Sequence, residues 1–189
     1  GLNVHPSLLP RWRGADPVPW AMLTGDAQTG VTIVTLSETF DEGAIIAQKK
    51  IPITDRDFAD PLRAKLFELG ADLLVDTLDS KGHPFKGSPQ DKHRASYARR
   101  LTRDDGFEPW ETLQKAFDDP DEARRIERKF RAFMPWPGLW TTIAAPARPA
   151  TQVHSKTGDK RLKILSLHLQ PTTYNLQLDT VQLEGKTPI

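Results

Sequence analysis

The chain has 189 residues, which is enough for one large domain or two small ones with a buried core. At 38% hydrophobic and 27% charged residues, its composition excludes disordered and fibrous classes. The absence of cysteine excludes disulfides, thiolate catalysis and thiolate zinc sites, and it is compatible with a reducing compartment. No window approaches the ~18 consecutive apolar residues of a membrane span, so we expect a globular protein away from the membrane.

The net charge of +1 conceals an asymmetry between the two parts of the chain. Residues 1–83 carry 8 Lys and Arg against 12 Asp and Glu, a balance of −4. Residues 84–189 carry 18 against 13, a balance of +5. The split predicts two domains, the second facing a polyanion, although ordinary solvated surface charge explains it equally well.

In chain order, the first part alternates predicted strands with predicted helices. Residues 2–5 alternate like the end of a strand, and Pro17 opens a short helix over residues 18–23. Residues 29–36 and 44–53 are rich in β-branched and apolar residues and predict two strands. From Phe58 to about Leu78, apolar residues including Leu62, Leu66, Leu69 and Leu73 repeat at helical spacing. This alternation predicts an α/β domain.

The second part begins after residues 81–91, which are rich in Gly, Pro, Lys and Ser and predict a linker. Residues 109–117 and 121–133 predict two helices, the second capped by Asp119 or Asp121. Residues 162–169 and 174–183 then alternate with a period of two. Short strands between Gly, Pro and Asn turns predict a small barrel. Trp136 and Trp140 are expected in its core, with a stacking platform for bases as the alternative.

Three polar residues could form a catalytic cluster. Asn3 and His5 are two apart on a strand and point to one side, where an amide and an imidazole could stabilise an oxyanion. Asp41 lies in a turn between two predicted strands and could hold the imidazole protonated or relay a proton through water. On spacing alone, the alternative remains that Asn3 and Asp41 are turn residues and His5 an ordinary buried polar residue.

The continuous string over residues 3–17 (NVHPSLLPRWRGADP) resembles the signature of folate-dependent formyltransferases. The pattern continues in register at residues 25–26 (GD), 29–32 (TGVT) and 41–43 (DEG). A motif of this length is far more specific than a single short pattern. The resemblance implies that Asn3, His5 and Asp41 are the catalytic residues.

The second module resembles one branch of that family. Residues 131–138 (RAFMPWPG) and 181–186 (VQLEGK) are similar to the C-terminal, OB-like tRNA-binding domain of methionyl-tRNA formyltransferases. Formyltransferases that act on glycinamide ribonucleotide share the HPSLLP motif, and those that act on UDP-sugars have a related second domain. A small-amine acceptor therefore remains an alternative, as does a non-catalytic RNA-binding fragment.

The resemblance implies a domain organisation and a set of ligands. Residues 1–83 would be the C-terminal part of a Rossmann-like formyltransferase domain, 84–103 a linker, and 104–189 a β-rich OB-like barrel. The implied donor is 10-formyltetrahydrofolate and the implied acceptor initiator methionyl-tRNA, with no metal and no membrane. We expect a monomer in the bacterial cytoplasm or an organellar matrix, with further sequence preceding Gly1.

Binding residues follow from the same resemblance and from clustered positive charge. The loop that would border the donor is expected to contribute Ser7, Leu8, Leu9 and Pro10, together with Glu38. Basic residues expected to meet tRNA phosphates are Arg11, Arg13, Arg99, Arg125, Lys129, Lys160 and Arg161. For any one of these cations, a solvated surface position is the alternative.

Overall fold

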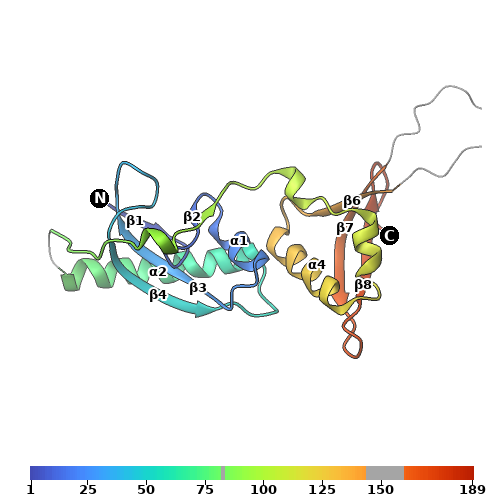
Figure 1. The fold of residues 1–189 in the computed structure, drawn as a ribbon, viewed down its shortest axis with the longest axis horizontal. Helices are drawn as coiled ribbons and strands as arrows, with labels where there is room; N and C mark the ends of the chain where they lie inside the picture. Colours follow the sequence, from blue (N-terminus) through green and yellow to red (C-terminus); the bar gives the residue numbers. More distant parts are fainter. Residues whose placement is uncertain (82–83, 144–159) are drawn as a thin grey trace, which may run out of the picture. The chain divides into compact units, whose positions relative to one another are not determined.

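The computed structural model describes residues 1–81, 84–143 and 160–189. They form two compact units, Gly1–Leu101 and Thr102–Ile189, each with a sheet and helices of its own (Figure 1). Across these described residues, no helix has both the length and the apolarity needed to cross a membrane.

Unit 1 contains an antiparallel sheet in the order β1-β3-β4. Its strands are β1 (Leu2–His5), β3 (Gln28–Thr35) and β4 (Ile45–Pro52), which confirms the three predicted strands. Leu2 pairs with Thr35 and His5 with Thr32. The loop that leaves β3 therefore begins beside the start of β1, where it can bring polar residues to the side chains of that strand.

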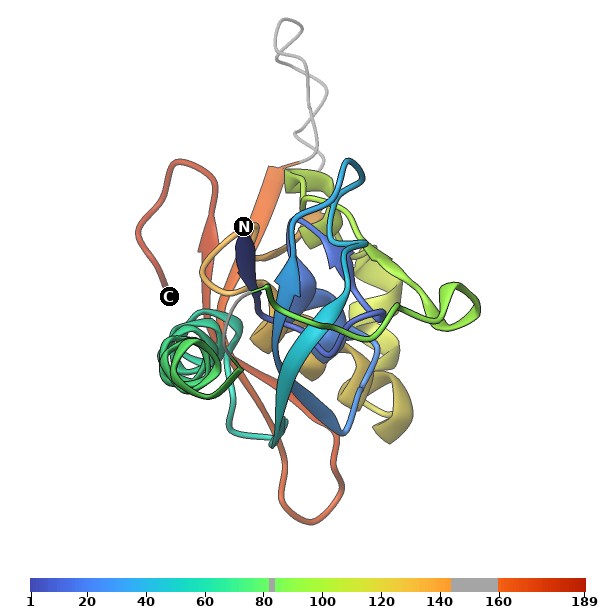
Figure 2. The same cartoon turned by 90° about the vertical axis from the view of Figure 1, so that its left-hand side faces the viewer.

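Two helices accompany this sheet, α1 (Pro17–Leu23) and the long α2 (Ala59–Lys81), both as predicted. Figure 2 looks almost along α2, which lies against one face of the sheet. Leu62 and Leu66 are fully buried there. At Gly70 a Cβ atom would lie 2.5 Å from Val4 and 2.9 Å from Val31, so only glycine permits this close approach.

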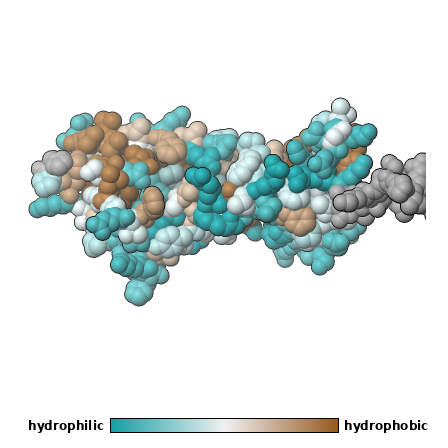
Figure 3. Space-filling view, turned by 90° about the horizontal axis from the view of Figure 1, so that it is seen from above, coloured by the Kyte–Doolittle hydropathy of each residue, from teal (hydrophilic) through white to brown (hydrophobic). Residues whose placement is uncertain are grey.

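Several large apolar side chains of unit 1 remain on its surface. Figure 3 shows apolar residues gathered on this unit, and the exposed large ones are Leu36, Phe40, Phe58, Phe67, Val75, Leu78 and Tyr97. The helical periodicity of α2 thus has a second apolar side besides the one that meets the sheet. Contiguous exposed apolar surface marks a binding region.

Most of the segment predicted as a linker, residues 84–103, is part of unit 1. Residues 84–101 belong to unit 1, and the boundary falls after Leu101. Ser88 exchanges two backbone hydrogen bonds with Ile45, and β5 (Tyr97–Ala98) pairs in parallel with β2 (Arg13–Gly14). Gly and Pro indicate irregular backbone, but they do not show whether that backbone is bonded to a distant strand.

Unit 2 begins with the 3₁₀ turn η2 (Arg103–Gly106) and continues with helices α3 (Trp110–Lys115) and α4 (Pro120–Phe133). The Asp119 side chain accepts hydrogen bonds from the backbone of Asp121 and Glu122, which confirms the expected cap of α4. The helices pack on a sheet through Leu113, Ile126 and other buried apolar residues. This core defines a helix-on-sheet unit.

The sheet of unit 2 has the strand order β6-β7-β8 and is antiparallel. Its strands are β6 (Leu139–Ile143), β7 (Lys160–Leu169) and β8 (Leu176–Leu183). The strands β7 and β8 were predicted from the sequence, whereas β6 was not. A closed barrel was expected, but the described residues of this unit form an open sheet, because β6 and β8 pair only with β7. Residues 144–159, between β6 and β7, lie outside the described part.

Candidate active site

The three predicted catalytic residues lie together in unit 1. Asn3 and His5 project from one side of β1, and Asp41 lies in the loop between β3 and β4. Asn3 Nδ2 donates to Asp41 Oδ1 over 3.2 Å, and His5 Nδ1 lies 3.6 Å from the same oxygen. The other carboxylate oxygen of Asp41 accepts the backbone N–H of Gly14 over 2.9 Å. The carboxylate of Asp41 therefore contacts the side chains of both Asn3 and His5 and is held in place by the backbone of Gly14.

The hydrogen bonds of His5 fix the use of its two ring nitrogens. Its Nε2 lies 2.9 Å from the carbonyl oxygen of Trp12, which can only accept, so Nε2 carries a hydrogen. The His5 side chain is 5% exposed. Nδ1 faces Asp41 at a distance longer than a hydrogen bond and keeps bonding capacity for another partner. Any proton that His5 exchanges must therefore pass through Nδ1.

A cavity of about 1140 Å³ opens beside these residues, and Asn3, His5 and Asp41 all line it. Its wall also contains the aromatic residues Trp12, Trp20, Phe40, Phe67 and Tyr97 and the cations Arg63, Arg99 and Arg100. The site thus combines flat apolar walls, a polar cluster and positive charge. Such a combination suits an elongated ligand with a ring system and anionic groups.

The five residues predicted to contact the donor lie outside the lining of this cavity. Ser7 and Leu9 are buried, and the Ser7 hydroxyl donates to the carbonyl of Arg11 over 2.8 Å. Leu8 and Pro10 are half-buried, whereas Glu38 is exposed in the loop after β3. The structure therefore brings the catalytic residues together at the cavity, and donor binding by Ser7, Leu8, Leu9, Pro10 and Glu38 stays a prediction.

The basic residues of unit 1 differ in their availability. Arg11 forms two hydrogen bonds with Asp26, which raise the pKa of Arg11. Burial would raise the pKa of Asp26, but hydrogen bonds from Arg11 and Trp12 outweigh it and lower that pKa. Arg13 is 2% exposed and binds Glu42, so it is a poor surface cation. Arg99 lies over the ring of Trp20 and lines the cavity.

In unit 2, the two predicted cations of α4 are bound to carboxylates. Glu108, itself 5% exposed, accepts from Lys129 Nζ over 2.8 Å and from Arg125 over 2.5 Å. Burial would raise the pKa of Glu108, but the hydrogen bonds and charges of Arg125 and Lys129 overcome it and lower that pKa. Burial would lower the pKa of Arg125, but its hydrogen bonds to Glu122 and Glu108 outweigh burial and raise that pKa. These two cations therefore serve the fold of unit 2.

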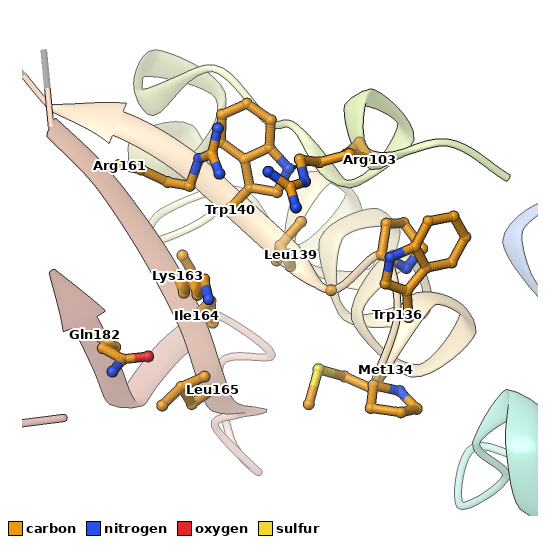
Figure 4. A pocket seen from close by; sticks show the side chains of 13 residues that line it. Arg103, Met134, Trp136, Leu139, Trp140, Arg161, Lys163, Ile164, Leu165 and Gln182 are labelled. Atoms are coloured by element: carbon orange, nitrogen blue, oxygen red, sulfur yellow. Dashed lines mark hydrogen bonds between the residues drawn. The ribbon is translucent and has the colours of Figure 1, made fainter. Parts of the chain in front are cut away.

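A basic pocket lies on the outer face of the sheet of unit 2 (Figure 4). Arg103, Arg161 and Lys163 line this cavity of about 270 Å³, together with Trp136 and Trp140. Trp136 is 56% exposed, so its predicted core position is wrong. The Pro-Trp-Pro sequence ends α4 and carries this indole away from the apolar core.

Arg161 of this basic pocket is already oriented. Its guanidinium lies 4.4 Å from the ring centre of Trp140, and among the described residues its buried Nε has no hydrogen-bond partner. Lys163 pairs across the sheet with Trp140 and Gln182, so all three face outward together. Lys160, also predicted to bind tRNA, is exposed at the start of β7. The described residues contain no cluster of potential metal ligands.

Comparison with known proteins gives the class to which this fold and site belong. The family model described as "Formyl transferase" matches residues 1–78, and "Formyl transferase, C-terminal domain" matches residues 117–188. These two matches cover both units and define the class as formyltransferases.

Individual relatives narrow this class. The chain is 39% identical, over its whole length, to the methionyl-tRNA formyltransferase of Roseiflexus castenholzii and spans 60% of that protein. The fold is similar to the structure of methionyl-tRNA formyltransferase from Clostridium thermocellum, with a TM-score of 0.66 and 15% identity. The aligned region includes 96% of the present chain and 67% of the Clostridium thermocellum protein. Aquifex aeolicus HypX in complex with tetrahydrofolic acid covers the entire chain, which spans 33% of HypX, with a TM-score of 0.62 and 17% identity. The chain belongs to the methionyl-tRNA formyltransferase family.

Proposed function

We propose that the protein transfers a formyl group from 10-formyltetrahydrofolate to the α-amine of initiator methionyl-tRNA. The observation that carries this proposal is the junction of Asn3, His5 and Asp41 at the edge of the large cavity of unit 1. Because the chain spans 60% of the length of its Roseiflexus castenholzii relative, the activity, donor and acceptor belong to the proposal.

The lining of the cavity fits a folate donor. Aromatic side chains such as Phe40 and Phe67 suit a flat ring, and the cations Arg63, Arg99 and Arg100 suit carboxylates. The binding of tetrahydrofolic acid by HypX, which shares the fold, supports this choice. When bound, the donor supplies the formyl carbon that the amine of the acceptor attacks.

The residues of the chain would stabilise charge and move one proton. The amide group of Asn3 has two hydrogens, of which one bonds to Asp41 and the other can meet the negative charge that develops on the formyl oxygen. His5 Nδ1 can donate to the same oxygen only from the doubly protonated ring, because Nε2 already carries the hydrogen that bonds to Trp12. Asp41 would accept the proton of the attacking amine through a water and return it to the departing nitrogen.

The acceptor would be held by the basic pocket of unit 2. Arg103, Arg161 and Lys163 converge there, and no carboxylate within the described residues forms a salt bridge with them. Phosphates of the tRNA backbone fit these cations, and the exposed indole of Trp136 can stack on an unpaired base. Contacts of this kind position an RNA without reading its sequence.

The test of the catalytic proposal is formyl transfer by Asp41→Asn and His5→Ala. Each substitution should lower kcat by about 100-fold or more, the scale of lost acid–base or oxyanion assistance, while methionyl-tRNA binding changes little. Asp55→Asn, at an exposed position, is the matched control. Near-normal turnover by Asp41→Asn would contradict the roles assigned here.

A further inference from the structure

The carboxylate of Asp41 stands on an unusual piece of backbone. Asp41 has a φ of 57°, in the left-handed region that residues other than glycine rarely adopt. Such a conformation costs of order 1–3 kcal/mol and persists only where surrounding contacts hold it. At Gly43, two residues further, a Cβ atom would lie 1.8 Å from the carbonyl oxygen of Thr35. The loop is therefore pressed against β3 and needs an external tie.

Gln90 supplies that tie. Its Nε2 donates to the carbonyl oxygen of Asp41 over 2.6 Å and to that of Gly43 over 2.9 Å. One amide group thus bridges the carbonyl of the left-handed residue and the carbonyl two residues further along the loop. Gln90 lies 49 residues away in sequence, in the segment that the composition predicted as a linker, and the backbone pairing of Ser88 with Ile45 anchors it nearby.

The other end of the Gln90 amide is held by a buried arginine. Its Oε1 accepts from Nε of Arg13 over 3.0 Å and from Nη2 over 2.9 Å. A third nitrogen of Arg13, Nη1, donates to Glu42 over 2.7 Å, so the residue beside Asp41 is fixed as well. The Tyr97 hydroxyl donates to the same Glu42 oxygen over 2.9 Å. These bonds also fix which way the amide of Gln90 points, because its oxygen must face the guanidinium.

We propose that Gln90 is a positioning residue for the reaction. Together with Arg13 it forms a clasp, here called the Gln90 clasp, that holds the backbone of Asp41 so that its carboxylate faces Asn3, His5 and the N–H of Gly14. Because Gly14 directly follows Arg13, the clasp and the bond from Gly14 to Asp41 are fixed by the same two-residue strand β2. This inference rests on the proposed catalytic role of Asp41.

The test uses Gln90→Glu, which separates the two ends of the clasp. The new carboxylate keeps an acceptor for Arg13, but it has no hydrogen for the carbonyls of Asp41 and Gly43 and places an oxygen against both. We expect kcat for formyl transfer to fall by about 10- to 100-fold, as expected for a misplaced catalytic group, with KM values for both substrates within about threefold. The control is Gln28→Glu, an exposed position at the start of β3.

A direct readout of position accompanies the kinetics. The Gly14 amide is hydrogen-bonded to the carboxylate of Asp41, so its hydrogen exchange, followed by NMR in the 189-residue chain, reports where that carboxylate lies. We expect exchange at Gly14 to accelerate at least about tenfold in Gln90→Glu and in Asp41→Ala, which removes the acceptor, but not in Gln28→Glu. If Gln90→Glu does not fold, Gln90→Met, which is uncharged and of similar length, takes its place in both measurements.

The outcomes separate this inference from the proposed function. Unchanged exchange at Gly14 with unchanged kcat in the Gln90 variant overturns the positioning role, even if Asp41→Asn is inactive. A loss shared equally between kcat and KM, with unchanged exchange at Gly14, also overturns it. Normal turnover by Asp41→Asn overturns the proposed function instead, and accelerated exchange in Gln90→Glu then still establishes that Gln90 fixes the carboxylate.

Discussion

The buried carboxylate of Glu108 should control the stability of unit 2. In Glu108→Gln, the ammonium of Lys129, whose side chain is 10% exposed, loses its charged partner and keeps only neutral acceptors, the carbonyl oxygen of Phe107 and the amide oxygen of the new side chain. Leaving one buried charge without its partner costs about 3 kcal/mol. Arg125 adds less than about 1 kcal/mol, because its side chain is 38% exposed and Glu122 remains bound to it. We therefore expect a loss of about 3 to 4 kcal/mol.

Urea unfolding of the whole chain measures this loss, with hydrogen exchange in α4 as the probe specific to unit 2. The control Glu111→Gln, at an exposed position of α3, should change stability by less than about 0.5 kcal/mol. Because the folded-state pKa of Glu108 is lowered, its contribution is complete above the unfolded pKa and is lost as pH falls through the folded pKa. The difference between wild type and Glu108→Gln should therefore shrink below about pH 4.5. A difference under 1 kcal/mol at pH 7, or one that grows on acidification, would refute the reasoning.

Three further predictions concern the cap of α4, the contact of α2 with the sheet, and RNA binding. Asp119→Ala should destabilise unit 2 by about 1 kcal/mol in urea melts through loss of the α4 cap, whereas its exposed neighbour variant Asp118→Ala should not. Gly70→Ala should cost about 1–3 kcal/mol in unit 1, because the new methyl group meets Val4 and Val31, while exposed Ala71→Ser stays near wild type in the same melts. The logarithm of tRNA affinity should fall as the logarithm of salt concentration rises. The double variant Arg161→Gln with Lys163→Gln should reduce the slope of that dependence by about two, whereas the control Lys115→Gln should leave it unchanged. Affinity that does not depend on salt would favour a small-amine acceptor.

Sequence patterns predicted the elements of regular structure well where a local cause sets them. Pro17 and the Asp119 cap define helix starts, and the β-branched residues of 29–36 favour a strand, so these elements were confirmed. The barrel was not, because strand pairing between distant segments decides whether a sheet closes. The same limit explains the linker prediction, since the bonds of Ser88 and Gln90 go to Ile45, Asp41 and Gly43.

In the candidate site, too, the sequence identified the residues that a local motif carries but not those that depend on distant contacts. A motif spanning residues 3–17 carries Asn3 and His5, and Asp41 follows in register, so the resemblance identified the cluster that the structure assembles. Nothing local marks Gln90, whose role depends on a contact across 49 residues. Trp136 was placed in the core because large aromatic residues usually are, yet the prolines on either side hold it at the surface.

The positive charge of the second half has to be divided by what each cation touches. Arg125 and Lys129 look like an ideal phosphate-binding row on a helix, but the carboxylate that neutralises them, Glu108, lies 17 and 21 residues earlier and meets them only after folding. Arg161 and Lys163 lie on the outer face of a strand whose inner face is occupied by Ile164. Glu184 lines a cavity beside them, but among the described residues no carboxylate forms a salt bridge with either cation. A cation that is paired with a buried carboxylate contributes to folding and releases no counterions from RNA. The proposed RNA-binding surface of unit 2 is therefore the basic pocket on the sheet, and α4 supports it from within the core.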